Sequence, residues 1–222
     1  MHPQDYKNDR HFLARKLIQH KMIKTKLDSP DGNGFRLKLH DKNPKAPLSP
    51  YYVDLRILRS FPPLYQYVAE LILHKVCFED GIGFNLVADV PTAGTPIVTL
   101  MSISRQTPMI SPRAPKDHGT QATIDGVYEP GETGLLVDDL VTGANSLLAS
   151  TKILHDAGLI VTDTAVLVDR EQGGREQLTA NGLRLHAVWT ITDLLAFYKA
   201  ENLIAPELVD EINAYRASVA VA

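Results

Sequence analysis

The segment from residue 135 to residue 146, Leu-Leu-Val-Asp-Asp-Leu-Val-Thr-Gly-Ala-Asn-Ser, constrains the fold of this chain more than any other. An uninterrupted apolar run such as Leu135-Leu136-Val137 is typical of a strand that is covered on both faces. Strands of that kind belong to parallel sheets with helices on either side. The sequence therefore predicts an α/β fold, with a parallel sheet flanked by helices.

The residues that follow this apolar run have the composition of a ligand-binding turn. Open α/β sheets bind ligands at the carboxyl ends of their strands, and a loop of small residues leaves backbone N–H groups free to surround a phosphate at the start of a helix. The hydroxyls of Thr142 and Ser146 would add donors. Asp138 and Asp139 would repel a phosphate, and they suit sugar hydroxyls, a developing cation or a hydrated Mg²⁺ instead. A structural interpretation stays open, in which Asp139 or Asn145 only caps the helix.

Strands and helices are predicted to alternate through most of the chain, as one domain over residues 1–222. The N-terminal part, 1–55, is expected to hold a helix (12–23) and strands (35–39 and 51–55) that cap the core. The rest, 56–222, is expected to be the α/β core with C-terminal helices. Its further strands are predicted at 86–90, 108–111, 164–168 and 183–188, and its helices at 62–72, 97–103, 146–157, 190–198 and from 206 onward.

Composition excludes several classes of protein. The chain has 222 residues, with 23 Lys and Arg against 26 Asp and Glu, so it cannot bind nucleic acid through bulk positive charge. A single cysteine, Cys77, excludes an internal disulfide and a cysteine-based metal cluster, and it fits a reducing compartment. Because no apolar stretch approaches the roughly 20 residues that span a bilayer, and the N-terminus lacks a signal-peptide pattern, we expect a cytoplasmic protein without membrane contact.

Residues 138–146 resemble the phosphoribosyl pyrophosphate (PRPP) motif of type I phosphoribosyltransferases, and the chain from about Phe35 to Tyr215 is similar to the orotate branch of that family. Three further segments carry the likeness: Ser49–Arg56 (SPYYVDLR), Lys116–Gly119 (KDHG) and Val168–Gly174 (VDREQGG).

The resemblance implies transfer of ribose 5-phosphate from PRPP to N1 of orotate, which yields orotidine 5′-monophosphate and pyrophosphate in pyrimidine biosynthesis. It implies Mg²⁺ that binds with PRPP rather than through a set of protein ligands. It further implies a small N-terminal hood and a homodimer in which the catalytic loop is shared between subunits.

Site residues follow from matching positions in this likeness. Asp138 and Asp139 match the residues that hold the ribose hydroxyls, and Arg170 matches the arginine that binds the orotate carboxylate. The residues that match the 5′-phosphate loop are Thr142, Gly143, Ala144, Asn145 and Ser146, and Thr142 also matches a contact to orotate.

Two further groups complete the implied site. Arg113, Lys116 and His118 lie in the segment that matches the catalytic loop, where Lys116 would neutralise pyrophosphate and His118 would hold it or donate to it. Lys38, Tyr51 and Tyr52 match the residues beside the base, although each has an ordinary alternative as a strand residue.

The chain departs from the family pattern at four places. Ala93 stands where the family often has a lysine, and Pro112 stands at the first arginine of the catalytic loop, with Arg113 at the next lysine. Ala144 replaces a glycine, and because alanine disfavours a positive φ we expect a rearranged loop. Residues 39–48 replace a shorter turn. These departures leave two alternatives open: a PRPP- or nucleotide-binding regulatory protein without turnover, and a transferase for another base.

Overall fold

A computed structural model describes residues 3–37, 39–113 and 122–220. Within them the chain forms two compact units. The larger comprises Phe61–Ile191 together with the N-terminal residues up to Arg10, and the smaller comprises His11–Ser60 together with the residues from Thr192 onward.

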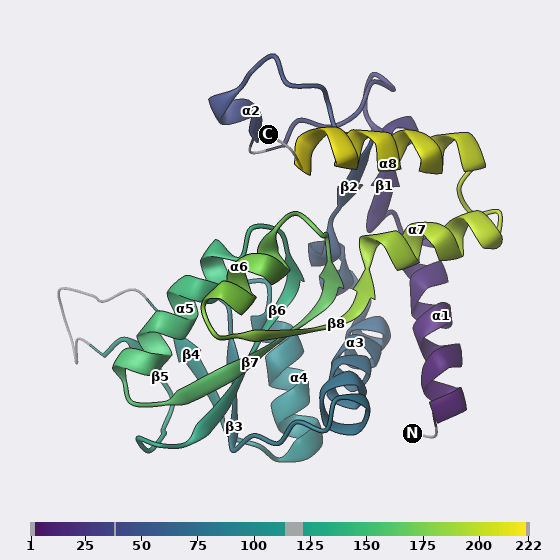
Figure 1. The fold of residues 1–222 in the computed structure, drawn as a ribbon. Helices are drawn as coiled ribbons and strands as arrows, with labels where there is room; N and C mark the ends of the chain where they lie inside the picture. The colour runs from purple at the N-terminus through teal and green to yellow at the C-terminus, as the bar shows by residue number, and fades with distance from the viewer. Residues whose placement is uncertain (1–2, 38, 114–121, 221–222) are drawn as a thin grey trace. The chain divides into compact units, whose positions relative to one another are not determined.

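The larger unit is built on one sheet (Figure 1), whose strand order among the described residues is β5-β4-β3-β6-β7-β8. Neighbouring strands from β4 to β8 run parallel, and the short β5 pairs antiparallel with β4. The strands are β3 (Leu86–Asp89), β4 (Met109–Pro112), β5 (Ile124–Asp125), β6 (Thr133–Val141), β7 (Ile160–Asp169) and β8 (Arg184–Thr190).

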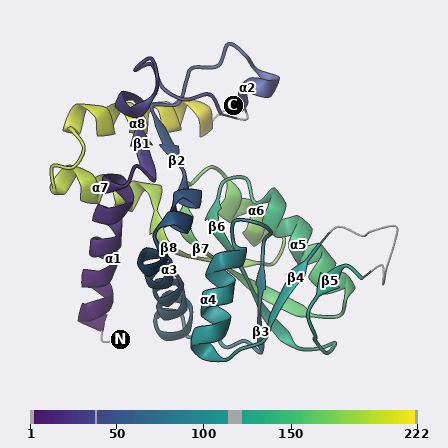
Figure 2. The same ribbon diagram turned by 180° about the vertical axis from the view of Figure 1, so that it is seen from behind.

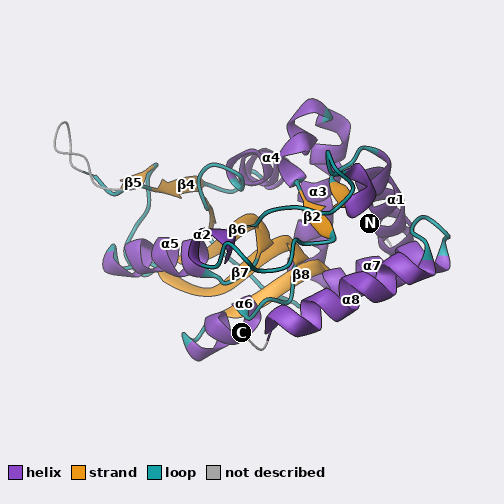
Figure 3. Ribbon diagram, turned by 90° about the horizontal axis from the view of Figure 1, so that it is seen from above, coloured by secondary structure: helices purple, strands orange, loops and turns teal. Residues whose placement is uncertain are grey.

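Helices cover both faces of this sheet. Figure 2 shows α3 (Pro62–His74) and α4 (Thr95–Arg105) on one face, and Figure 1 shows α5 (Asn145–Asp156) and α6 (Gly174–Ala180) on the other. The view from above in Figure 3 shows the strands between these two layers. The connection from β3 to β4 runs toward one edge of the sheet, whereas the connections from β6 to β7 and from β7 to β8 run toward the other edge. Right-handed crossovers therefore place the connecting helices on opposite faces.

The central strand has the burial that its apolar run predicts. Leu135, Leu136 and Val137 are each 0% exposed. Leu136 packs in the hydrophobic core with Leu147 and Leu154 of α5. The prediction of a parallel sheet covered on both faces is confirmed.

Strand β6 is longer than its apolar run. It continues through both aspartates to Val141, because β7 pairs with it along that length, with Asp138 opposite Val166 and Val141 opposite Asp169. The interpretation in which the strand ends at the acidic pair is wrong in this respect: the aspartates belong to the strand, and the loop begins after Val141.

The smaller unit contains a two-stranded antiparallel sheet of β1 (Ile23–Thr25) and β2 (Tyr51–Val53). Its helices include α7 (Ile191–Ala200), α8 (Pro206–Ala220), the short α2 (Leu39–Lys42) and the part of α1 (Pro3–Gln19) that follows Arg10. The hydroxyl of Tyr198 donates to the carbonyl of Ala14 at 2.9 Å, which ties α7 to α1 inside this unit.

Two predictions for the N-terminal segment are wrong. The first helix ends at Gln19 rather than at Ile23, because Lys21 adopts a φ of +58° and the chain turns into β1. The strand predicted at 35–39 is reduced to one bridge between Phe35 and Ser49, and the chain becomes helical at Leu39.

Within the part of the chain that the structure describes, no helix combines the length and the apolar character needed to cross a membrane.

Candidate active site

Three neighbouring strands of the larger unit bring acidic residues to the carboxyl edge of the sheet. Asp89 is the last residue of β3, Asp169 is the last residue of β7, and Asp138 and Asp139 lie near the end of β6 between them. Asp89 and Asp169 are fully buried and Asp138 is 8% exposed. This edge is where parallel α/β sheets bind ligands.

The turn between β6 and α5 presents unused backbone donors. Among the described residues, no acceptor receives a hydrogen bond from the backbone N–H groups of residues 142–146. Helix α5 has Ala144 as its N-cap residue and no side-chain cap. Asp139 instead accepts the N–H of Leu140 at 2.8 Å. The interpretation in which Asp139 or Asn145 caps the helix is therefore wrong, and the turn keeps the donors that a phosphate requires.

Ala144 takes the conformation that we expected it to avoid. Its φ is +57° and its ψ is 2°, in the left-handed region, and its side chain is 5% exposed. The β-carbon therefore does not prevent the turn from forming, and the expected rearrangement is not needed to accommodate it.

Close packing from α6 fixes the backbone of this turn. A β-carbon at Gly174, the first residue of α6, would collide with the carbonyl oxygen of Thr142 and with the side chain of Val141. The N–H of Arg170 donates to the carbonyl of Val141 at 3.0 Å. The end of β7 and the start of α6 thus both contact the backbone where the turn begins.

The carboxylates at this edge repel one another. Burial, together with the charges of Asp139 and Asp89, raises the pKa of Asp138 to about 8. Oδ1 of Asp89 is buried without a hydrogen-bond partner among the described residues, while Oδ2 accepts a hydrogen bond from the Thr95 hydroxyl. The edge therefore carries more negative charge than its own side chains neutralise, which suits a cationic group or a bound divalent ion.

The loop after β3 approaches the neighbouring strand closely. A β-carbon at Gly94 would lie 2.5 Å from the carbonyl oxygen of Val137, so only glycine fits there. Ala93 lies in this loop and brings no charge, so the loop offers backbone groups and hydroxyls to a ligand.

Arg170 follows β7 directly and is 7% exposed. The preceding Asp169 shapes its turn, because Oδ1 of Asp169 accepts the N–H of Glu171 at 2.8 Å. Glu171 has a φ of +51°. The structure thus places Arg170 beside the end of β6, as the sequence predicts.

The remaining predicted residues belong to the larger unit, to the smaller unit, or to the part of the chain outside the described residues. Arg113 lies at the end of β4, where its Nε donates to Asp125 Oδ1 of β5 at 2.8 Å; no hydrogen bond or ion pair among the described residues joins it to the aspartates of β6. Tyr51 is 1% exposed and belongs to the core of the smaller unit. Tyr52 is half-buried and its ring lies 5.6 Å from that of Phe35. Lys38, Lys116 and His118 lie outside the described residues.

Arg175 is the site residue that sequence reasoning missed. Its Nε donates to Asp169 Oδ2 at 3.1 Å, and its Nη2 lies 3.0 Å from the same oxygen. The available signal was that the buried strand before Arg170 ends in an aspartate, Asp169, as the strand at 86–89 ends in Asp89. A fully buried carboxylate needs a nearby hydrogen-bond donor.

The chain is similar to known orotate phosphoribosyltransferases. No protein-family model matches it. It is 32% identical to the orotate phosphoribosyltransferase of Cenarchaeum symbiosum over 166 residues, which cover 74% of this chain and 83% of that protein. It is 38% identical to the uridine 5′-monophosphate synthase of Bos taurus over 168 residues, which cover 75% of this chain but 35% of that longer protein.

A solved structure supports the same relation. The Leishmania donovani UMP synthase superimposes with a TM-score of 0.76 and 28% identity, over 94% of this chain and 42% of that one. The fold, the acidic edge with its uncapped turn, and these identities together show that the chain belongs to the orotate phosphoribosyltransferase family.

Proposed function

We propose that this protein transfers ribose 5-phosphate from PRPP to N1 of orotate, releasing pyrophosphate and forming orotidine 5′-monophosphate. The observation that carries the proposal is the turn of residues 142–146, whose unused backbone donors lie directly after two carboxylates on one strand. A molecule that combines a phosphate with sugar hydroxyls matches both features.

The turn would hold the 5′-phosphate of PRPP. Its N–H groups lie at the start of α5, where the helix dipole also favours an anion. Asp138 and Asp139 would accept hydrogen bonds from the ribose hydroxyls.

The same carboxylates would assist bond cleavage. When pyrophosphate leaves, positive charge develops on the ribose ring, and negative groups fixed nearby stabilise that charge. The raised pKa of Asp138 reports how unfavourable the unneutralised cluster is, and a developing cation would relieve that repulsion.

Mg²⁺ is the proposed cofactor. No group of three or more His, Cys, Asp or Glu side chains among the described residues is placed to hold a metal ion, so the ion would bind chiefly through PRPP. The unpartnered buried oxygen of Asp89 and the repulsion around Asp138 fit a cation at this edge. Bound with pyrophosphate, Mg²⁺ would neutralise charge on the leaving group.

Arg170 would bind the carboxylate of orotate, since a planar guanidinium pairs with a planar carboxylate through two parallel hydrogen bonds. Its position at the end of β7, next to the strand with the two aspartates, supports this role.

Several parts of the proposal rest on the family likeness. These are the roles of Lys116, His118 and Arg113 in a loop shared across a homodimer, and of Lys38, Tyr51 and Tyr52 beside the base. A cytoplasmic location is proposed on the same likeness, and the single cysteine fits it.

A second candidate is a PRPP-binding regulator without turnover. The loss of charge at Pro112 favours it, as does the engagement of the neighbouring Arg113 with Asp125.

An absorbance assay of orotate consumption separates the two candidates. With PRPP and Mg²⁺, the transferase is expected to consume orotate faster than uracil or other pyrimidine bases. Tight PRPP binding without consumption of any base would contradict turnover and favour the regulator, and consumption of another base would reassign the substrate.

Substitution of Arg170 tests the assignment of the base site. Arg170→Ala is expected to raise the KM for orotate roughly 30-fold or more, because loss of one partner of a buried charge pair costs about 2–5 kcal/mol. Steady-state kinetics at saturating PRPP would measure it. Arg170→Lys keeps the charge but loses the paired geometry, and it should show an intermediate KM. Arg105→Ala, at an exposed position of α4, is the control, and an orotate KM that is equal in all variants would contradict the assignment.

A further inference from the structure

A polar pocket lies along the edge of β8 and shares Arg175 with the site described above. Its volume is about 560 Å³, and residues of three segments line it: the π-helical segment η3 (Lys75–Glu79) with the residues after it, α6, and β8. The sheet order ends at β8. Arg184 and His186 come from the first half of that strand, whereas the candidate active site lies at the carboxyl ends of the strands.

Basic side chains dominate the lining of the pocket, and carboxylates hold each of them in place: Lys75 pairs with Glu79 at 3.1 Å and with Asp80 at 3.0 Å. Lys75, Arg175, Arg184 and His186 line the pocket, against the single carboxylate of Asp80. The carboxylates of Asp163 and Asp169 pair with Arg184 and Arg175 but are not part of the lining.

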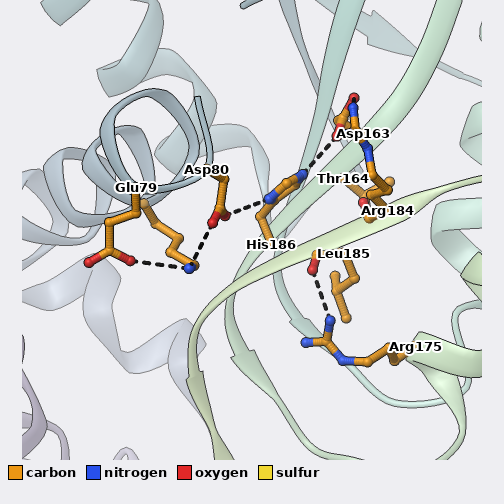
Figure 4. Close-up of polar contacts among 9 residues, drawn as sticks. Glu79, Asp80, Asp163, Thr164, Arg175, Arg184, Leu185 and His186 are labelled. Carbon is orange, nitrogen blue, oxygen red and sulfur yellow. Dashed lines mark hydrogen bonds and ion pairs between the residues drawn. The ribbon is translucent and has the colours of Figure 1, made fainter. Parts of the chain in front are cut away.

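His186 bridges two of the carboxylates around the pocket. Figure 4 shows its ring between Asp80 and Asp163, with Nδ1 at 2.6 Å from the first carboxylate and Nε2 at 2.7 Å from the second. Burial opposes ionisation of both acids, but hydrogen bonds from His186 and from neighbouring side chains outweigh it and lower the pKa of each. The ring of His186 thus links the two carboxylates through its two nitrogens.

The pocket also offers unused hydrogen-bond donors. The side chain of Arg184 is 65% exposed and binds Asp163 through Nη2 alone, so its Nε and Nη1 have no acceptor among the described residues. The side chain of Arg175 is 44% exposed. Its Nη1 donates a hydrogen bond to the carbonyl of Leu185 in β8 at 2.9 Å, as Figure 4 shows. The free nitrogens of Arg184 are suited to the oxygens of a phosphate, and the guanidinium of Arg175, held by Asp169 and Leu185, lies on the same wall.

We propose that this pocket binds a small molecule that carries a phosphate group. The volume lies in the range of sites for drug-sized molecules and mononucleotides. The phosphate would bind the two free nitrogens of Arg184, and Arg175, Lys75 and His186 lie on the same wall.

Occupancy of the pocket has a direct route to the turn that holds Arg170. Arg175 contacts the pocket and also binds Asp169, and Asp169 accepts the N–H of Glu171. A phosphate that draws Arg175 toward the cavity would change the environment of the Glu171 amide. This consequence concerns the backbone of the turn and does not require that the protein consume orotate.

Amide chemical shifts of the 222-residue chain test the proposal. Inorganic phosphate and, in a separate arm, uridine 5′-monophosphate would be titrated at constant ionic strength into the ¹⁵N-labelled protein. Saturable shifts of the Thr179 and Ala187 amides, followed by that of Glu171, are expected in at least one arm. Shifts of residues 142–146 report the active-site turn separately, so binding there is not mistaken for binding in this pocket. The arm with the tighter saturation indicates whether the bare anion or the nucleotide is preferred.

Matched variants complete the test. Arg184→Gln should weaken binding at Thr179 and Ala187 tenfold or more, and Lys75→Gln should weaken it in the same direction. Arg56→Gln should leave it unchanged, since Arg56 is similarly exposed, at 64%, and also pairs with an aspartate. Circular dichroism would verify that each variant is folded. The absence of saturable shifts at these amides in both arms, or equal affinity in the wild type and a folded Arg184→Gln variant, would overturn the proposal.

Discussion

At the scale of single residues, the proposed function depends most on Asp138 at the sheet edge. It is buried beside two other carboxylates, and its pKa is raised to about 8. The sequence indicates the acidic pair, because adjacent aspartates follow an apolar run. It does not indicate the third carboxylate, Asp89, which is 49 positions away along the chain and comes near only because β3 pairs with β6.

Substitution of Asp138 is expected to change the pH dependence of stability. The folded-state pKa lies above the ordinary value of 3.8, so the protonated carboxyl contributes stability that is present below about pH 4 and is lost as the pH rises through 8. The Asp138→Asn variant has no carboxyl to ionise at this position, so it does not lose this stability as the pH rises. Its Tm relative to the wild type should therefore rise between pH 4 and pH 8, by at least about 5 °C in total. Thermal unfolding of the ligand-free protein, followed by circular dichroism, measures it.

The control is Asp156→Asn, which removes an exposed carboxyl of α5 with a side chain that is 63% accessible. Its Tm profile should run parallel to that of the wild type. If the Asp138→Asn profile also ran parallel to the wild type across this range, Asp138 would not be held in a repulsive environment.

At the scale of elements, the turn of residues 142–146 depends on a neighbouring helix. The sequence predicts the turn and the helix after it from local composition. It does not predict that β6 extends to Val141, because that extension comes from pairing with β7. Nor does it predict that α6 begins directly against Thr142, since Gly174 is 32 positions further along the chain. The failed strand at 35–39 has a similar cause: an alternating pattern forms a strand only where a partner strand is available.

Gly174→Ala is expected to displace the start of α6 from the turn. The added β-carbon would meet the Thr142 carbonyl and the Val141 side chain, and overpacking of this kind costs about 1–3 kcal/mol. The Tm should fall by several degrees, and calorimetric titration should show weaker PRPP binding. Gly83→Ala is the matched control, because a β-carbon there meets nothing within 4 Å. Equal stability and PRPP affinity in the two variants would show that close packing by α6 does not support the turn.

At the scale of the whole molecule, the sequence predicts the features of the fold that local residue patterns encode. Buried apolar runs at regular intervals, separated by helical stretches, indicate the parallel sheet, and the handedness of crossovers restricts how the helices cover it. The pocket at β8 could not be predicted, because Lys75, Arg175 and His186 come from segments that meet only in the folded larger unit. The grouping of residues from Thr192 onward with His11–Ser60 likewise joins segments that are far apart in the sequence.

The central claim is that the backbone of residues 142–146 receives the phosphate of a ribose 5-phosphate group. Titration of ribose 5-phosphate into the ¹⁵N-labelled protein tests it most directly. We predict saturable downfield shifts of the amide protons from Thr142 to Ser146, larger than those at any other described residue and weakened in Gly174→Ala. Saturable binding that leaves these five amides unshifted would contradict the account.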